Sequence, residues 1–129
     1  MANQTEGRYL SDWLKWEEDN LFSREEITLL AGSGSDRDIK TGTALGKLTS
    51  GGKYVPLTEG PSDGSQTPAG LLLLDNVVLD GVDKQAAAIV RDAIVNWDTV
   101  VWPATYNDAD IAAAVVIFKT LGIVMREGA

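Results

Sequence analysis

The stretch that decides the fold is Gly42-Thr-Ala-Leu-Gly-Lys-Leu-Thr-Ser-Gly-Gly-Lys-Tyr-Val-Pro-Leu57. Short segments that favour β structure alternate here with glycine, and we expect strands over 44–48 and 53–57. Gly51-Gly52 predicts the hairpin turn between them, because glycine adopts positive φ without steric cost. The stretch holds nothing that could act as a catalyst, so it favours a binding protein over an enzyme.

The sequence on both sides of this stretch predicts further short strands. Downstream, Asp63-Gly-Ser-Gln-Thr-Pro-Ala-Gly-Leu-Leu-Leu-Leu74 ends in an apolar run over 69–74, which is typical of a strand buried on both faces. Upstream, Ser23-Arg-Glu-Glu26 has the form of a helix capping box. A glycine-rich loop begins within two turns of it, however, so we expect a strand over Glu26 to Leu30. Another short strand is expected around Ile39.

The last third of the chain contains one ambiguous segment and one clear helix. Three alanines in 84–95 favour a helix, whereas its Ile-Val pairs favour a strand, and propensity alone leans towards the helix. A helix is predicted near 108–121, because Asn107 is a suitable N-cap and Gly122 a suitable C-terminal stop. Extended structure should resume at 123–125. The predicted helix carries an apolar stripe made of Ile111, Val115, Phe118 and Leu121.

The composition argues against several classes of function. The chain of 129 residues has no cysteine and no histidine, so it lacks thiolate and imidazole metal ligands and the commonest general base near neutral pH. A formal charge of −8, from 19 acidic and 11 basic residues, argues against DNA or RNA as a partner, because such binding depends on Lys and Arg. No apolar run approaches the ~20 residues that span a bilayer, so we expect a soluble protein with no membrane partner.

Two motifs that resemble ligand sites are weak. Gly42 to Lys47 looks like a phosphate-binding loop, but it lacks the full glycine spacing, and Leu48 stands where a magnesium-binding hydroxyl residue would be. Asp80 and Asp83 do not have the spacing of a calcium-binding loop, and turn formation explains them better. We therefore predict no catalytic, cofactor-binding or metal-binding residues, no cofactor and no enzyme activity.

The first thirty residues are rich in large apolar and aromatic side chains. Ser11 is a suitable N-cap for a short helix through Trp16. Two interpretations of the segment stay open: its side chains cover the domain's own core, or they form an arm that becomes ordered on a partner and uses aromatic residues as anchors. The residues in question are Tyr9, Leu10, Trp13, Leu14, Trp16, Leu21 and Phe22.

Several motifs, in order along the chain, resemble the phage head decoration proteins of the lambda protein D family. They are Gly42-Thr-Ala-Leu-Gly-Lys, Gly52-Lys-Tyr-Val-Pro, Ser62-Asp-Gly-Ser-Gln-Thr-Pro-Ala-Gly-Leu-Leu, Val101-Trp-Pro103 and the closing helix followed by Gly122-Ile-Val. The resemblance covers roughly residues 39 to 126. It implies a mainly β fold with a C-terminal helix (α+β), a small mixed β domain with a barrel-like core, and an extended N-terminal arm before it. It also implies strands, not a helix, over 84–95.

The resemblance further implies what the protein does. Members bind the outside of the expanded phage head as homotrimers and cement it against internal DNA pressure, so the expected partner is the major capsid protein. The expected location is the outer surface of the virion, after assembly from the host cytoplasm. Residues 1–38 would contact the capsid and residues 39–129 would form the decoration domain. The arm's contact residues would be Tyr9, Leu10, Trp13, Leu14, Trp16, Leu21, Phe22, Ile27 and Leu29. Two places stay open for Trp97, Trp102 and Tyr106, which are the trimer seam and the core.

An alternative function belongs to a different class. A small β domain of this kind can be a carrier or a ligand-binding module of a bacterial complex. A carrier needs a modifiable lysine at an exposed hairpin, and Lys53 beside Gly51-Gly52 is the candidate. An adduct on Lys53, found by intact mass, would favour this alternative.

Overall fold

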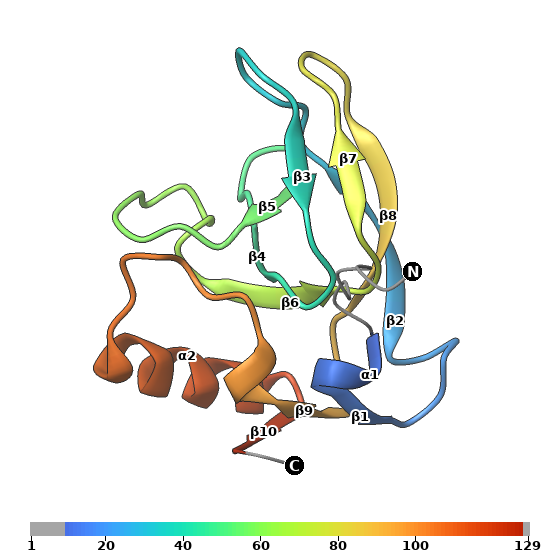
Figure 1. Ribbon diagram of the computed structural model, residues 1–129, viewed down its shortest axis with the longest axis vertical. Helices are drawn as coiled ribbons and strands as arrows, with labels where there is room; N and C mark the ends of the chain where they lie inside the picture. Colours follow the sequence, from blue (N-terminus) through green and yellow to red (C-terminus); the bar gives the residue numbers. More distant parts are fainter. Residues whose placement is uncertain (1–9, 128–129) are drawn as a thin grey trace, which may run out of the picture.

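The computed structural model describes residues 10–127 of the chain (Figure 1). Strands dominate it, and the one long helix lies near the C-terminus, which confirms the mainly β (α+β) expectation. In this part of the chain no helix combines the length and the apolar character needed to cross a membrane. In chain order the elements are α1 (Leu10–Trp13), β1 (Leu14–Glu17), β2 (Arg24–Leu29), β3 (Arg37–Ile39), β4 (Ala44–Lys47), β5 (Tyr54–Pro56), β6 (Pro68–Leu72), β7 (Asn76–Val78), β8 (Lys84–Ile89), β9 (Ala93–Asn96), the 3-10 helix η1 (Trp97–Thr99), α2 (Asp108–Thr120) and β10 (Ile123–Arg126).

Five strands close into a small barrel in the order β2-β5-β4-β6-β8. The paired strands run antiparallel except β2 and β5, which are parallel and pair through Leu29 and Tyr54. Strands β3 and β7 form a separate antiparallel ribbon, and β1, β9 and β10 form a three-stranded sheet with β10 parallel to β9. Figure 1 shows the β3–β7 ribbon at one end of the molecule and α2 at the other.

The barrel wall separates two hydrophobic clusters, because side chains alternate faces along a strand. On and just after β6, Leu71 and Leu73 belong to an outer cluster, while Leu72 points into the inner cluster with residues from every barrel strand. On β8, Ala88 belongs to the inner cluster and Ile89 to the outer one. The expectation that the leucine run forms a strand buried on both faces is therefore confirmed.

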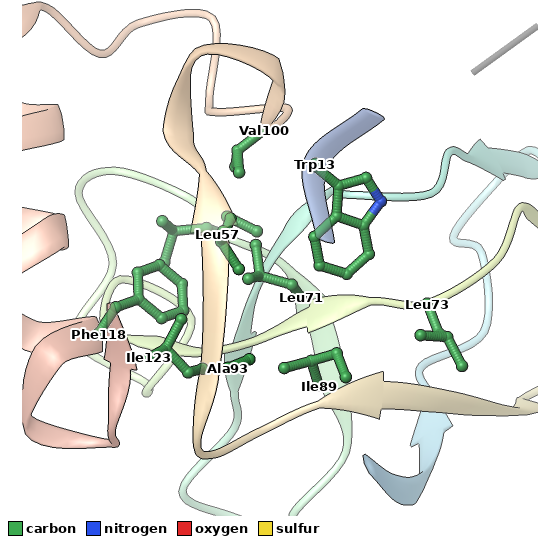
Figure 2. Packing of buried hydrophobic residues seen from close by; sticks show 11 residues of the cluster. Trp13, Leu57, Leu71, Leu73, Ile89, Ala93, Val100, Phe118 and Ile123 are labelled. Atoms are coloured by element: carbon green, nitrogen blue, oxygen red, sulfur yellow. The ribbon is translucent and has the colours of Figure 1, made fainter. Parts of the chain in front are cut away.

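Helices α1 and α2 complete the outer cluster. Trp13 from α1 and Phe118 from α2 enter it from two sides, with Leu71 between them (Figure 2). Both aromatic side chains are 0% exposed. The indole N–H of Trp13 donates to the Thr41 hydroxyl at 2.9 Å, and that hydroxyl donates to the carbonyl of Leu73. The polar atom of the indole is thus satisfied inside the core, as buried polar groups require.

The ambiguous segment 84–95 forms strands β8 and β9, so the helical leaning of its alanines is wrong and the expectation from the resemblance is correct. Ala88 and Ile89 are both 0% exposed, on opposite faces of β8. A segment buried on both faces of a barrel wall is held by its neighbours on either side. Tertiary packing therefore overrides its helix propensity.

The N-terminal helix is shorter than expected. It ends at Trp13, and β1 follows directly, so the expected helix through Trp16 is wrong. The reason is long-range pairing: Leu14 lies opposite Val95, and Trp16 lies opposite Ile94 of β9. Residues 10–38 as a whole are built into the domain, because β2 is a barrel strand and Trp13 is part of the core.

The C-terminal helix begins and ends where the sequence indicates. The Asn107 side chain accepts from the N–H of Asp110 at 2.9 Å, and the Asp110 carboxylate accepts from the N–H of Asn107 at 3.0 Å. This reciprocal cap satisfies two donors that a helix start leaves open. The helix ends at Thr120, and Gly122 has a φ of 82°, which favours glycine. The expected extended segment follows as β10.

Candidate functional site

The described residues offer no metal centre, since none of their acidic side chains gather into a group that could hold an ion. The segment that resembled a phosphate-binding loop runs into strand β4, and its Lys47 lies 5.9 Å from the centre of the Tyr54 ring. Lys53, the candidate for a carrier, forms an ion pair with Asp83 at 2.6 Å. The candidate site is therefore a surface whose side chains fit a protein partner.

The N-terminal residues predicted to bind a partner divide into buried and exposed ones. Exposure reaches 48% for Trp16, 88% for Leu21 and 48% for Phe22, so these three side chains are presented to solvent. The fold buries Trp13, Ile27 and Leu29, so the prediction that these three residues contact a partner is wrong. Leu10 and Leu14 are half-buried against the outer cluster. Tyr9 lies outside the described residues.

The exposed residues lie on β1 and on the loop from Glu18 to Ser23, which carries its own network of hydrogen bonds. Ser23 is fully buried, and its hydroxyl accepts from the N–H of Glu18 at 3.1 Å and donates to the carbonyl of Asp92 at 2.9 Å. Within the loop, the carbonyl of Asp19 accepts from the N–H groups of Phe22 and Ser23. The loop conformation is therefore fixed by the fold itself. Figure 1 shows this loop on the side of the molecule away from α2.

Two ion pairs flank the loop. Arg24 binds both carboxylate oxygens of Glu17, at 2.9 and 2.7 Å, and these hydrogen bonds raise the pKa of the Arg24 guanidinium. Arg91 binds Glu25 at 3.1 Å, donates to the carbonyl of Phe22, and lies 5.3 Å from the centre of the Phe22 ring. A guanidinium at this distance is attracted by the ring and holds it in place.

The aromatic residues predicted for a trimer seam lie together beside α2. The Trp102 ring stacks on Tyr106 with centroids 6.2 Å apart, and the Trp102 indole N–H donates to the carbonyl of Trp97 at 3.1 Å. Trp102 also meets Phe118 edge to face at 6.1 Å. All three predicted residues are half-buried, and Trp102 and Tyr106 pack against the outer cluster.

Two apolar surfaces were missed by the sequence analysis. Trp97 and the outer side of α2, with Ile111 and Val115, line a hollow of about 280 Å³. The predicted stripe thus divides, because Phe118 points into the core while Ile111 and Val115 face this hollow. The sequence signal of a second apolar face was Val116, an apolar residue outside the predicted stripe. Its side chain is 64% exposed in the structure.

The second missed surface lies on and around strand β7, for which the sequence analysis predicted no element. Val77 and Leu79 are exposed on either side of the buried Val78, and such an alternating run of apolar residues could have predicted a short strand. The exposed apolar side chains of this surface are Leu74, Val77, Leu79 and Val82, each between 51% and 59% exposed. The loops at the end of the ribbon are tied together, since Gly34 N–H donates to Asp80 and Asp80 N–H donates to Asp36, both at 2.8 Å.

Comparison with known proteins identifies a family. The model of the family described as bacteriophage lambda head decoration protein D matches residues 3–123. No curated protein matches the chain. The family is a structural one found in the phage head, so a partner in the capsid and a place in the virion come with the match. Because the match spans both the N-terminal segment and the barrel, the chain belongs to the bacteriophage lambda head decoration protein D family.

Proposed function

We propose that the protein binds the outer surface of the expanded phage head as a homotrimer, after it is made in the host cytoplasm, and stabilises the head against internal DNA pressure. The family match over residues 3–123 carries this proposal. The partner is the major capsid protein, and no nucleic acid is contacted. The protein acts by adhesion and not by catalysis.

The capsid contact is made by residues 1–38, which also supply strand β2 of the barrel, and residues 39–129 form the rest of the decoration domain. Within the described part of this segment, Trp16, Leu21 and Phe22 are the anchors, because they are large, exposed and held in place. Large aromatic and aliphatic anchors provide most of the binding energy in protein interfaces. A loop that is already ordered loses little conformational entropy when it binds, which favours affinity.

The trimer seam is made by the surface beside α2. Trp97, Trp102 and Tyr106 are half-buried there, and Val116 adds an exposed apolar side chain. A threefold ring needs a surface that meets a different surface of the next subunit. The hollow lined by Trp97 and Ile111 is an apolar recess that can receive side chains from the neighbouring subunit.

Binding stabilises the head by mass action. A ligand that binds the expanded lattice and not the unexpanded one stabilises the expanded state by about 2.7 kcal/mol per site when its concentration is 100 times Kd. A trimer makes several contacts at once, so weak single contacts add up to strong attachment. Many copies on one shell therefore resist a large outward force.

Sedimentation with expanded shells that lack the protein tests the proposal. We expect the wild type to co-sediment at saturable stoichiometry, and Leu21→Ala and Phe22→Ala to weaken binding by about tenfold each, as anchors do. Leu74→Ala and Val82→Ala remove apolar side chains that are 59% and 55% exposed on another surface, and these variants should bind like the wild type. Wild-type protein that stays in the supernatant at all concentrations would refute the function.

The trimer is tested separately by analytical ultracentrifugation and by the arrangement of subunits on decorated shells. Val116→Asp places a charge on the proposed seam, at a side chain that is 64% exposed and so not needed for the core. We expect it to lower the trimer fraction without lowering the melting temperature. A trimer fraction equal to that of the wild type would move the seam elsewhere.

A further inference from the structure

A shallow hollow of about 330 Å³ lies beside the proposed anchor Leu21, on the outer face of the β2–β8 pair. Glu26 of β2 and Gln85 and Ala87 of β8 line it. The hollow is an open surface feature continuous with the anchor, because Leu21 is itself one of its lining residues.

Strand register sets the chemistry of the hollow. Glu26 lies opposite Ala87, so both side chains stand on the same face of the sheet. The small Ala87 leaves room beside the long glutamate, and with Leu21 it gives the hollow an apolar wall. Three charged side chains line the hollow: Arg24, Glu25 and Glu26. The Glu26 side chain is exposed to solvent.

The charges around the hollow do not balance. Arg24 is bound by Glu17, and Arg91 is bound by Glu25. No basic group in residues 10–127 pairs with Glu26. The charged side chains that line the hollow are one cation, Arg24, and two carboxylates, Glu25 and Glu26, which gives a net charge of −1. Arg24 and Glu25 each have an ion-pair partner, so Glu26 is the carboxylate left for a partner's cation.

We propose that this hollow receives a lysine or arginine side chain of the capsid protein. The aliphatic part of such a side chain packs against Leu21 and Ala87, and its cationic end binds the Glu26 carboxylate. A purely apolar side chain would desolvate Glu26 without pairing it, and an acidic one would be repelled. The inference rests on the proposed function and names the partner chemistry that this surface selects.

Binding to expanded shells at several salt concentrations tests the inference. Glu26→Gln removes the charge and keeps the shape, and Glu26→Lys reverses the charge. We expect Glu26→Gln to weaken binding by at least about tenfold, and Glu26→Lys to weaken it further. The salt dependence should become less steep in Glu26→Gln, because one attractive pair is lost. Both variants should melt like the wild type, since Glu26 is exposed and unpaired.

The matched control uses Glu127, an exposed glutamate that follows β10 and lines neither this hollow nor the one beside α2. Glu127→Gln and Glu127→Lys change the net charge by the same amounts and should bind with wild-type affinity. Equal losses in the Glu127 and Glu26 variants would indicate an effect of net charge and would overturn the inference. If all proteins bind equally with the same salt dependence, the inference fails and the proposed function stands. If the wild type does not bind, the proposed function itself fails.

Discussion

Replacing Trp13 by alanine tests whether the N-terminal segment is part of the fold. The side chain is 0% exposed, and truncating such a tryptophan costs about 3–5 kcal/mol. The Thr41 hydroxyl also loses its indole donor, which adds about 1 kcal/mol. Domains of this size have a free energy of unfolding of about 5–15 kcal/mol, so the substitution should remove a large share of it.

The measurement is urea and thermal unfolding followed by circular dichroism, because the substitution itself removes a fluorophore. We expect the melting temperature to fall by about 10–20 °C for a chain of this length. Trp16→Ala is the matched control: it removes the same side chain three residues later, at a site that is 48% exposed. It should cost about 1 kcal/mol or less.

For binding, Trp16→Ala should have a large effect relative to its effect on stability, unlike Trp13→Ala. Trp16→Ala should weaken attachment to expanded shells more than it lowers stability, because the side chain is exposed. If Trp13→Ala and Trp16→Ala lower the free energy of unfolding equally, then Trp13 is not buried in the outer cluster in solution. That result would contradict the assignment of α1 to the outer cluster.

Two further predictions concern the backbone and pH. Gly122→Ala should lower the free energy of unfolding by about 2–3 kcal/mol, since a left-handed φ costs about 1–2 kcal/mol and the new Cβ would meet the Asp92 carboxylate. Gly81→Ala has a similar φ but open space around it, so urea titration should show a loss of about 1 kcal/mol; equal losses would exclude the contact with Asp92 as a cause. The hydrogen bond from Lys53 lowers the pKa of Asp83 below its ordinary value of 3.8. The stability that Asp83 contributes is therefore present above pH 3.8, and it is lost as the pH falls through the lower pKa of the folded state. Lys53→Met should raise the Asp83 pKa, which an NMR titration measures. An unchanged Asp83 pKa would contradict the pairing.

The site could be predicted only in part. Trp16, Leu21 and Phe22 are recognisable from the sequence as large apolar side chains among acidic residues, but Trp13 has the same local signal and lies in the core. The hollow at Glu26 and Ala87 has no sequence signal, because strand register brings together two residues that are far apart in the chain.

The sequence by itself determined the β4–β5 hairpin turn and the ends of α2. Gly51 and Gly52 adopt φ values of 89° and 71° in the expected hairpin, and Asn107 caps α2 as predicted. Such features depend on a few neighbouring residues, so local sequence is sufficient to specify them.

Only the tertiary structure decided which segments became strands and which faces were buried. Leu14 extends the chain as β1 because Val95 lies opposite it, and 84–95 is extended because it forms part of the barrel wall and of the neighbouring sheet. Trp13 is buried and Trp16 exposed for the same kind of reason. The groups that cover a side chain come from distant parts of the sequence, and local propensity is weaker than the packing they provide.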